Sequence, residues 1–288
     1  MAKTGENLMD KIVALAKRRG FIFPGSEIYG GLAGIWDYGP LGSELKFNFK
    51  QAWWKYMVSE RENIFGINAS ILMNPKVWEA SGHTAAFTDP LVECKMCHER
   101  IRADQEGEIK SHSEIHKAKK EKVEWTDPKK FNLLMEAKLG VIDGEKSTVY
   151  LRGEITQGVH VNFKNILDSI HPKIPFGVAQ IGKAFRNEIT PGNFTYRLRE
   201  FEQMELQYYV RPDEKEAMKA FEMWKKERMK WYVLLGLNKN KLRFREHTSD
   251  ERAHYARAAW DIEYETPFGW REAEGIHHRG DWDLSQHS

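Results

Sequence analysis

Two short segments of the chain combine arginines with carboxylates at a spacing that could bind phosphate. Residues 186–188 read Arg-Asn-Glu at the end of an apolar segment, and residues 197–205 read Arg-Leu-Arg-Glu-Phe-Glu-Gln-Met-Glu at the start of the next. The turn-rich residues 189–193, Ile-Thr-Pro-Gly-Asn, connect them and predict a hairpin. Such a hairpin gathers three arginines and several carboxylates around one cleft. Burying so many charges is costly unless they pair with one another or meet a ligand.

These residue types favour a site for a polyphosphate and an adenine ring. Arginine binds phosphate through two parallel hydrogen bonds, and carboxylates hold the Mg²⁺ ion that bridges phosphates. Phe201 offers an aromatic face on which adenine can stack. The alternative is a solvated, salt-bridged hairpin, which is the usual explanation for any single Arg–Glu pair. For the whole run of charges we expect the ligand site.

A second candidate site combines Cys94-x-x-Cys97 with His112-x-x-x-His116, with 14 residues between the two pairs. That spacing fits a Cys₂His₂ zinc site. The stretch between the pairs lacks the apolar core of a zinc finger, however. Two free, reduced cysteines and two histidines on an exposed helix therefore stay open as the alternative.

The elements that must position these residues follow from the apolar periodicity. Mixed strands and helices without regular βαβ alternation favour an α+β fold, an antiparallel sheet flanked by helices. Residues 91–130 are polar and rich in Lys and Glu, which indicates a small inserted module between domain parts 1–90 and 131–288. We expect helices at 8–19, 42–63, near 111–123, 157–170 and 213–235, and strands at 64–73, 149–152, 175–186, 197–210, 242–246, 259–265 and 269–275.

Composition sets broader bounds. The 288 residues are 41% hydrophobic and 30% charged, which is typical of a globular protein. No apolar run approaches the roughly 20 residues of a membrane span, and the N-terminus lacks the apolar segment of a secretory signal. Two cysteines cannot form a disulfide framework, so we expect a cytoplasmic protein with no membrane partner. The net charge of +2 neither indicates nor excludes a nucleic-acid partner, since a local basic face is enough to bind RNA.

The hairpin resembles motif 2 of class II aminoacyl-tRNA synthetases. The longer string at 175–191, Pro-Phe-Gly-Val-Ala-Gln-Ile-Gly-Lys-Ala-Phe-Arg-Asn-Glu-Ile-Thr-Pro, is similar to the homodimeric glycyl-tRNA synthetases. Five further strings carry the same resemblance, which extends over almost the whole chain: Trp-Asp-Tyr-Gly-Pro-Leu-Gly at 36–42, Leu-Met-Asn-Pro at 72–75, Trp-Glu-Ala-Ser-Gly-His at 78–83, Arg-Ala-Asp at 102–104 and Phe-Gly-Trp-Arg-Glu at 268–272.

The resemblance implies a glycine–tRNA ligase, which activates glycine with ATP to glycyl-adenylate and transfers it to the 3′ end of a glycine tRNA. Arg186 would be the catalytic residue at the α-phosphate, and ATP would bind with Mg²⁺. The residues implied for ATP are Arg186, Asn187, Glu188, Tyr196, Arg197, Leu198, Arg199, Glu200, Phe201, Glu272 and Ala273. Those implied for glycine are Arg102, Glu154, Phe201, Glu202, Gln203, Met204 and Glu205.

The resemblance also implies macromolecular partners. The chain departs from the family's usual sequence in two places. A homodimer would form through motif 1, where Trp53 and Trp54 are adjacent, and the lysine-rich residues 110–130 are either a solvated helix face, which we favour, or a contact to the tRNA acceptor stem. The family usually has Pro-Glu-Thr-Ala-Gln where residues 153–157 read Gly-Glu-Ile-Thr-Gln. Motif 3 and an anticodon-binding domain would be expected beyond Ser288.

Two other classes of function remain open from the sequence. One is a synthetase-like protein that binds nucleotide or regulates without charging tRNA. The other is a structural or interaction protein with no catalytic activity. Intact Arg186, Glu188, Arg199 and Glu272 favour the enzyme.

Overall fold

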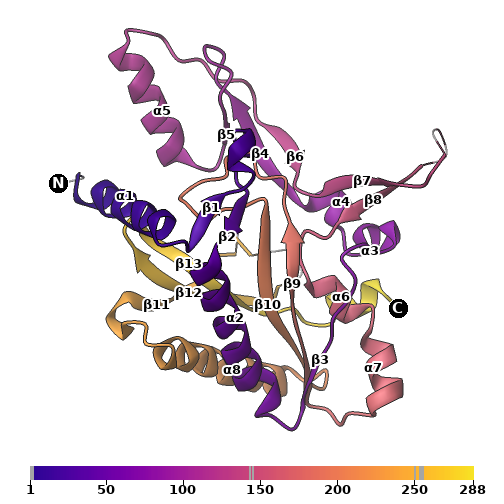
Figure 1. Ribbon diagram of the computed structural model, residues 1–288. Coiled ribbons are helices and arrows are strands. Elements are labelled where there is room, and N and C mark those ends of the chain that lie inside the picture. The colour runs from indigo at the N-terminus through magenta and orange to yellow at the C-terminus, as the bar shows by residue number, and fades with distance from the viewer. Residues whose placement is uncertain (1–2, 143, 145, 250, 253–255) are drawn as a thin grey trace.

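The computed structural model describes residues 3–142, 144, 146–249, 251–252 and 256–288. It mixes helices with several small sheets, most of them antiparallel, as an α+β fold requires (Figure 1). The helices are α1 (Lys3–Arg18), α2 (Pro40–Trp54), α3 (Pro75–Ala80), α4 (His83–Ala86), α5 (Glu106–Ala118), α6 (Thr156–His160), α7 (Phe163–Ile170), α8 (Glu214–Leu234) and α9 (Trp282–Gln286). The strands are β1 (Ile22–Pro24), β2 (Trp36–Tyr38), β3 (Ile64–Gly66), β4 (Thr88–Glu93), β5 (Arg100–Arg102), β6 (Lys129–Asn132), β7 (Met135–Leu139), β8 (Ser147–Leu151), β9 (Phe176–Phe185), β10 (Glu200–Tyr209), β11 (Leu242–Glu246), β12 (Ala258–Thr266) and β13 (Gly269–His278).

The hairpin β9–β10 is the centre of the molecule. Its two strands pair antiparallel from Phe176↔Tyr209 to Phe185↔Glu200, and β3 adds to β9 in parallel. One face packs on a core formed with α2 and α8, which includes Trp53, Met57 and Trp231. The paired strands therefore hold the charged loop at residues 186–199 on a rigid base.

Helix α8 joins this sheet to a second one. The second sheet has the order β11-β12-β13 and packs Ile262 and Ile276 against Phe221 of α8. Side chains alternate along a strand, so the residues on either side of Ile262 point away from α8. The second sheet thus presents a polar face that includes Asp261 and Glu263.

The polar insertion forms a separate lobe at the top of Figure 1. Its sheet has the order β5-β4-β6, and α5 lies beside it. Helix α5 was predicted near 111–123. It instead begins at Glu106, and Lys120 has positive φ (63°) just after it ends.

Most element predictions are confirmed to within a few residues. Strand β11 matches its predicted range, while α8, β9 and β10 are slightly shorter than predicted. The start of α2 is fixed by a close approach: a Cβ on Gly42 would lie 1.8 Å from the carbonyl oxygen of Phe21. Only glycine fits there.

Three predictions are wrong. The helix predicted for 42–63 is α-helical only as far as Trp54, continues as a short π-helix over Lys55–Ser59 and then ends. The strand predicted for 64–73 stops at Gly66, because the backbone beyond it bonds to side chains: Gln180 accepts from the amide of Ala69, and Arg152 donates to its carbonyl. The helix predicted for 157–170 is two helices, α6 and α7.

Candidate active site

Arg186 lies at the end of β9, between two aromatic rings. Its guanidinium is 5.2 Å from the ring centre of Phe87 and 5.3 Å from that of Phe201. Nε donates to the carbonyl of Gly153 at 3.0 Å. These contacts fix the plane of the guanidinium and direct it into the cleft.

Glu188 forms a second polar centre with groups of the insertion. Its side chain is buried, and Oε2 has no hydrogen-bond partner among the described residues; the nearest cation is Arg197, with Nε at 3.9 Å. Burial raises the pKa of Glu188, and the charge of Asp89 adds to the rise, while Arg197 opposes it. A buried, unsatisfied carboxylate oxygen is ready to accept a hydrogen bond from a ligand.

Arg102 belongs to this second centre. It donates to Asp89 at 2.7 Å and to both oxygens of Asp104 at 3.0 and 2.7 Å. The bond with Asp104 outweighs desolvation and raises the pKa of Arg102 further. The structure therefore groups Arg102 with Glu188 and Arg197 rather than with Glu154.

Two of the residues implied for ATP, Arg199 and Leu198, have side chains that contact the protein itself. Arg199 donates to the carbonyl of Glu188 at 3.2 and 3.0 Å and to that of Ala33 at 2.8 Å. The side chain of Leu198 is buried, and the amide of Asn187 donates to the carbonyl of Leu133 at 2.8 Å. These residues shape the loop.

Glu272 faces the same cleft from β13. The hydroxyl of Tyr196 donates to its carbonyl at 3.4 Å, which ties the charged loop to the second sheet. Desolvation and the charge of Asp261 raise the pKa of Glu272, and Arg186 is among the cations that oppose this. Asp261 is buried, and its Oδ1 has no hydrogen-bond partner among the described residues. The carbonyl of Ala273 accepts from Tyr232, on the α8 side.

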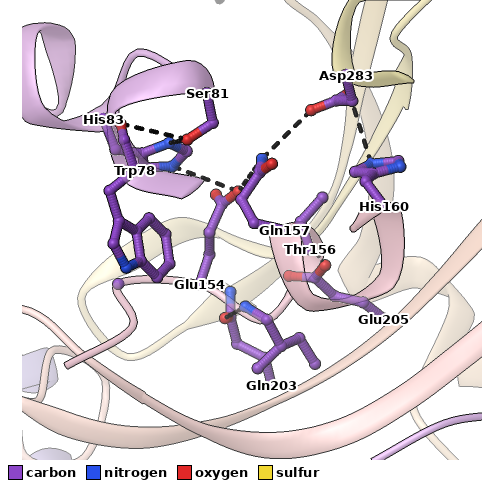
Figure 2. Close-up of polar contacts among 12 residues, drawn as sticks. Trp78, Ser81, His83, Glu154, Thr156, Gln157, His160, Gln203, Glu205 and Asp283 are labelled. Carbon is purple, nitrogen blue, oxygen red and sulfur yellow. Dashed lines mark hydrogen bonds and ion pairs between the residues drawn. The ribbon is translucent and has the colours of Figure 1, made fainter. Parts of the chain in front are cut away.

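A pocket with two carboxylates lies on the other side of Arg186. Figure 2 shows Glu154 pointing toward His83 and Gln157, with Glu205 beside Thr156. Nε2 of His83 is 3.3 Å from Glu154. Although burial alone would raise the pKa of Glu154, His83 and Arg279 bring it below its ordinary value.

The pKa of Glu205 shifts in the opposite direction. Burial and the neighbouring charge of Glu154 raise the pKa of Glu205 to about 7, against the hydrogen bond that Thr156 donates. Gln203 lies on the same face of β10 and accepts from the amide of Ile155 at 3.2 Å. Two carboxylates this close together can bind a small cation such as an ammonium group.

Comparison with known proteins identifies proteins that the chain is similar to. The chain is 49% identical to the glycine–tRNA ligase of Geobacillus thermodenitrificans and 51% identical to those of Treponema denticola and Caldanaerobacter subterraneus subsp. tengcongensis, each over 97% of its length. Over almost its whole length the chain is therefore similar to glycine–tRNA ligases. It spans 64%, 61% and 65% of the length of these three relatives. No protein-family model matches the chain.

Strand alternation corrects part of the glycine site that the resemblance to this family implied. Phe201, Gln203 and Glu205 share the cleft face of β10, whereas Glu202 and Met204 point to the other face. Glu202 pairs there with Lys46 at 2.8 Å and Lys50 at 3.1 Å, and Met204 packs on the core. Glu200 also points away and pairs with Lys183. Glu202, Met204 and Glu200 therefore point away from Glu154 and Glu205.

The sequence analysis missed several residues of the candidate site. Asp283 accepts two hydrogen bonds from Arg279 at 2.7 and 2.8 Å. It accepts one more from Gln157 at 3.3 Å (Figure 2). The string at 78–83 contained His83, but nothing in it indicated the contact with Glu154. Phe87 had no signal at all, because a lone aromatic residue is most often part of a core.

The four Cys and His side chains of the insertion lie together. One ligand atom from each of Cys94, Cys97, His112 and His116 is within 4.8 Å of the others. Cys94 and both histidines are buried, and Cys97 is exposed. This group could hold a metal ion.

Proposed function

We propose that the chain activates glycine with ATP and transfers it to a glycine tRNA, on a class II synthetase fold. One observation carries the proposal. Arg186 lies between the two-carboxylate pocket of Glu154 and Glu205 and the acidic face that holds Glu272. An arginine at that position can contact a carboxylate on one side and a phosphate on the other. The shared name of the relatives supports the same activity.

The reaction needs no nucleophile from the protein. Glu154 and Glu205 accept the ammonium group of glycine, so its carboxylate points toward Arg186. That carboxylate attacks the α-phosphorus of ATP, and pyrophosphate leaves. Arg186 stabilises the extra negative charge on the phosphate in the transition state, and its two aromatic neighbours prevent it from turning away.

Selectivity for glycine follows from the lining of the pocket. Ile155, Thr156 and Gln157 are buried around it, and Arg152 fills the space above Gly182, where a Cβ would lie 2.2 Å from the guanidinium. A larger amino acid would have to displace these packed groups. Rejection of larger amino acids by steric clash suits glycine, which offers the protein only its ammonium and carboxylate groups for binding.

ATP would bind as its Mg²⁺ complex. The carboxylates of Glu272 and Asp261 fit this ion, since Oδ1 of Asp261 is buried without a hydrogen-bond partner among the described residues, while its Oδ2 pairs with His247 at 2.8 Å. The charge of Asp261 also raises the pKa of Glu272. Mg²⁺ supplies positive charge against the phosphates. We include in the proposal one Zn²⁺ ion at Cys94, Cys97, His112 and His116.

A glycine tRNA and a second copy of the chain are the proposed macromolecular partners. Trp53 and Trp54 cannot carry the dimer, because Trp53 is buried in the core and Trp54 packs beside it, against Gly66. Exposed apolar side chains instead cover α1, the turn after β1 and α2, and this face fits a dimer interface. They are Leu8, Ile12, Leu15, Ile28, Tyr29, Leu32, Leu41, Leu45 and Phe47. No described helix is long and apolar enough to cross a bilayer.

The division of the chain belongs to the proposal as well. Parts 1–90 and 131–288 would form the catalytic domain, and 91–130 the inserted module. The sheet β5-β4-β6 and α5 support this division, since they lie between residues 88 and 132.

The test is ATP–pyrophosphate exchange with each of the twenty amino acids. We expect glycine to support the fastest exchange. Equal or faster exchange with alanine or serine would overturn the assignment of the substrate. Nucleotide binding without exchange for any amino acid would favour the synthetase-like binding protein over the enzyme.

A further inference from the structure

The hairpin β4–β5 connects the Cys/His group to the rim of the candidate cleft. Its turn, residues 94–99, contains both cysteines, and its strands pair through Leu91↔Arg102 and Glu93↔Arg100. At the far end, Arg102 pairs with Asp89 at 2.7 Å. Both charges act on the buried Glu188, so one short hairpin carries the cysteines and the partners of Glu188.

Helix α5 returns the chain from the rim to the cysteines. Strand β5 leads about 10 Å away from the turn, counting three residues from Glu99 to Arg102. The helix then runs back about 9 Å from Glu106 to His112. The turn between β5 and α5 contains Asp104, whose two carboxylate oxygens accept hydrogen bonds from Arg102. Asp104 lies two residues before α5, so the position of this helix acts on the carboxylate that binds Arg102.

Apolar packing gives α5 little support. The buried residues of this helix are His112 and His116, and its Ile115 is 58% exposed. A helix usually docks through an apolar stripe, and two imidazoles are a weak substitute. A shared metal ion would supply the missing attachment.

The histidines have the surroundings of metal ligands. Nδ1 of His112 faces Glu99 at 3.5 Å, and Nδ1 of His116 faces Glu121 at 2.5 Å. The Nε2 atom of His112 is 3.5 Å from Sγ of Cys97. A carboxylate on the outer nitrogen orients a histidine whose other nitrogen binds a metal. Two thiolates and two imidazoles within 4.8 Å of one another match tetrahedral zinc.

We infer that zinc bound by Cys94, Cys97, His112 and His116 fixes Arg102 and Asp89 at the rim of the nucleotide cleft. The metal fastens α5 to the turn of β4–β5. Arg102 then keeps its bonds to Asp89 and Asp104 and faces Glu188. The effect on nucleotide binding rests on the proposed function, whereas the metal site does not.

The first test measures zinc in the full 288-residue chain by atomic emission. We expect about one equivalent per chain. Cys94→Ser and His116→Ala should each lose it. His98→Asn is the matched control, because His98 lies in the same turn outside the group and asparagine tolerates its positive φ of 60°. Protein that contains no zinc, and whose α5 amides exchange at the same rate with and without added Zn²⁺, would overturn the metal site.

The second test removes zinc with a selective chelator while Mg²⁺ stays in excess. Amide hydrogen exchange should become faster at 100–118 and stay unchanged in β9 and β10. ATP affinity should fall about tenfold, the cost of one charge-assisted contact. Arg102→Ala should weaken ATP binding in zinc-loaded protein and add nothing once zinc is removed.

The outcomes separate the two proposals. Unchanged exchange at residues 102–105 after zinc removal, or additive effects of chelation and Arg102→Ala, would overturn the positioning role. Zinc-loaded protein that binds no ATP would contradict the proposed function, while its zinc content and hydrogen exchange would still decide the metal site.

Discussion

The cleft and the insertion hold charged side chains in place by different means. Arg186 follows β9, a ten-residue strand in which Val178, Ala179 and Ala184 are fully buried, and Glu205 lies on β10, the ten-residue strand paired with it. Arg102 extends from a three-residue strand whose neighbouring helix buries two histidines. The cleft is positioned by packing, and we propose that the insertion is positioned by a metal. Changes in the cleft should therefore alter chemistry without unfolding it, whereas changes in the insertion should first alter its order.

Among the substitutions in the cleft, Arg186→Ala should have the largest effect on activity. We expect adenylate formation to fall by about 10²–10³-fold, because the variant loses a preorganised donor to the charge that develops on the phosphate. Pyrophosphate exchange measures this, and the melting temperature should change little. Arg211→Ala is the control, since that arginine is exposed and lies far along the chain from the cleft. A well-folded Arg186→Ala protein with ordinary exchange would exclude the role.

The pH dependence of stability tests the carboxylate pair. Folding raises the pKa of Glu205 from 4.5 to about 7, so between these values the folded state holds a proton that the unfolded state has released. Stability from this group should therefore fall, by on the order of 2–3 kcal/mol, as pH rises from about 4.5 to about 7. Glu205→Gln should remove this fall.

Urea unfolding at pH 5 and pH 7.5 measures the effect as a difference between the two proteins. The difference is needed because His160 and His277, with pKa values lowered to about 4 by burial, act in the opposite direction as pH falls. Glu265→Gln, an exposed glutamate on β12, is the control. Parallel pH profiles for the wild type and Glu205→Gln would contradict the buried carboxylate pair.

Glu154→Gln tests the ammonium receptor. The substitution keeps the shape of the side chain and removes its charge. We expect glycine affinity to fall about 10–100-fold, which is the cost of one hydrogen bond to a charged group. Calorimetric titration with glycine measures it, and an unchanged affinity would show that the ammonium group binds elsewhere.

Glu202→Gln should have the smallest effect. This residue neighbours the site in sequence but points to α2, where it pairs with Lys46 and Lys50. We expect a loss of about 1 kcal/mol in the free energy of unfolding, because these partners are only half-buried. Glycine affinity should not change. A large loss of glycine affinity would restore Glu202 to the site.

The sequence predicted β9 to β13 and the long helix α8 well, because their apolar periodicity is strong. It predicted the membership of the site less well. A contiguous string such as 201–205 ignores the alternation that turns Glu202 away from the cleft. The pairing of His83 with Glu154 joins residues 71 positions apart, and no local pattern encodes such a contact.

In the insertion, local sequence spacing was informative for part of the candidate site. Its cysteine and histidine spacing predicted a cluster, and the four side chains lie together in the structure. The position of Arg102 could not be predicted, since it depends on how α5 returns to the turn of β4–β5. Short-range spacing therefore located the candidate metal ligands but not the side chains they position.

The most direct test of the central claim is the binding of a non-hydrolysable glycyl-adenylate analogue, a glycyl sulfamoyl-adenosine, compared with its alanyl and seryl counterparts. Calorimetric titration into the 288-residue chain reports the dissociation constants without requiring catalysis. We predict that the glycyl compound binds at least about tenfold more tightly than either counterpart, because one extra methyl or hydroxymethyl group meets a packed wall. We also predict that Arg186→Ala and Glu154→Gln both weaken it. Equal affinity for the alanyl compound, or unchanged binding to both variants, would contradict the account of the cleft as a glycine-activating site.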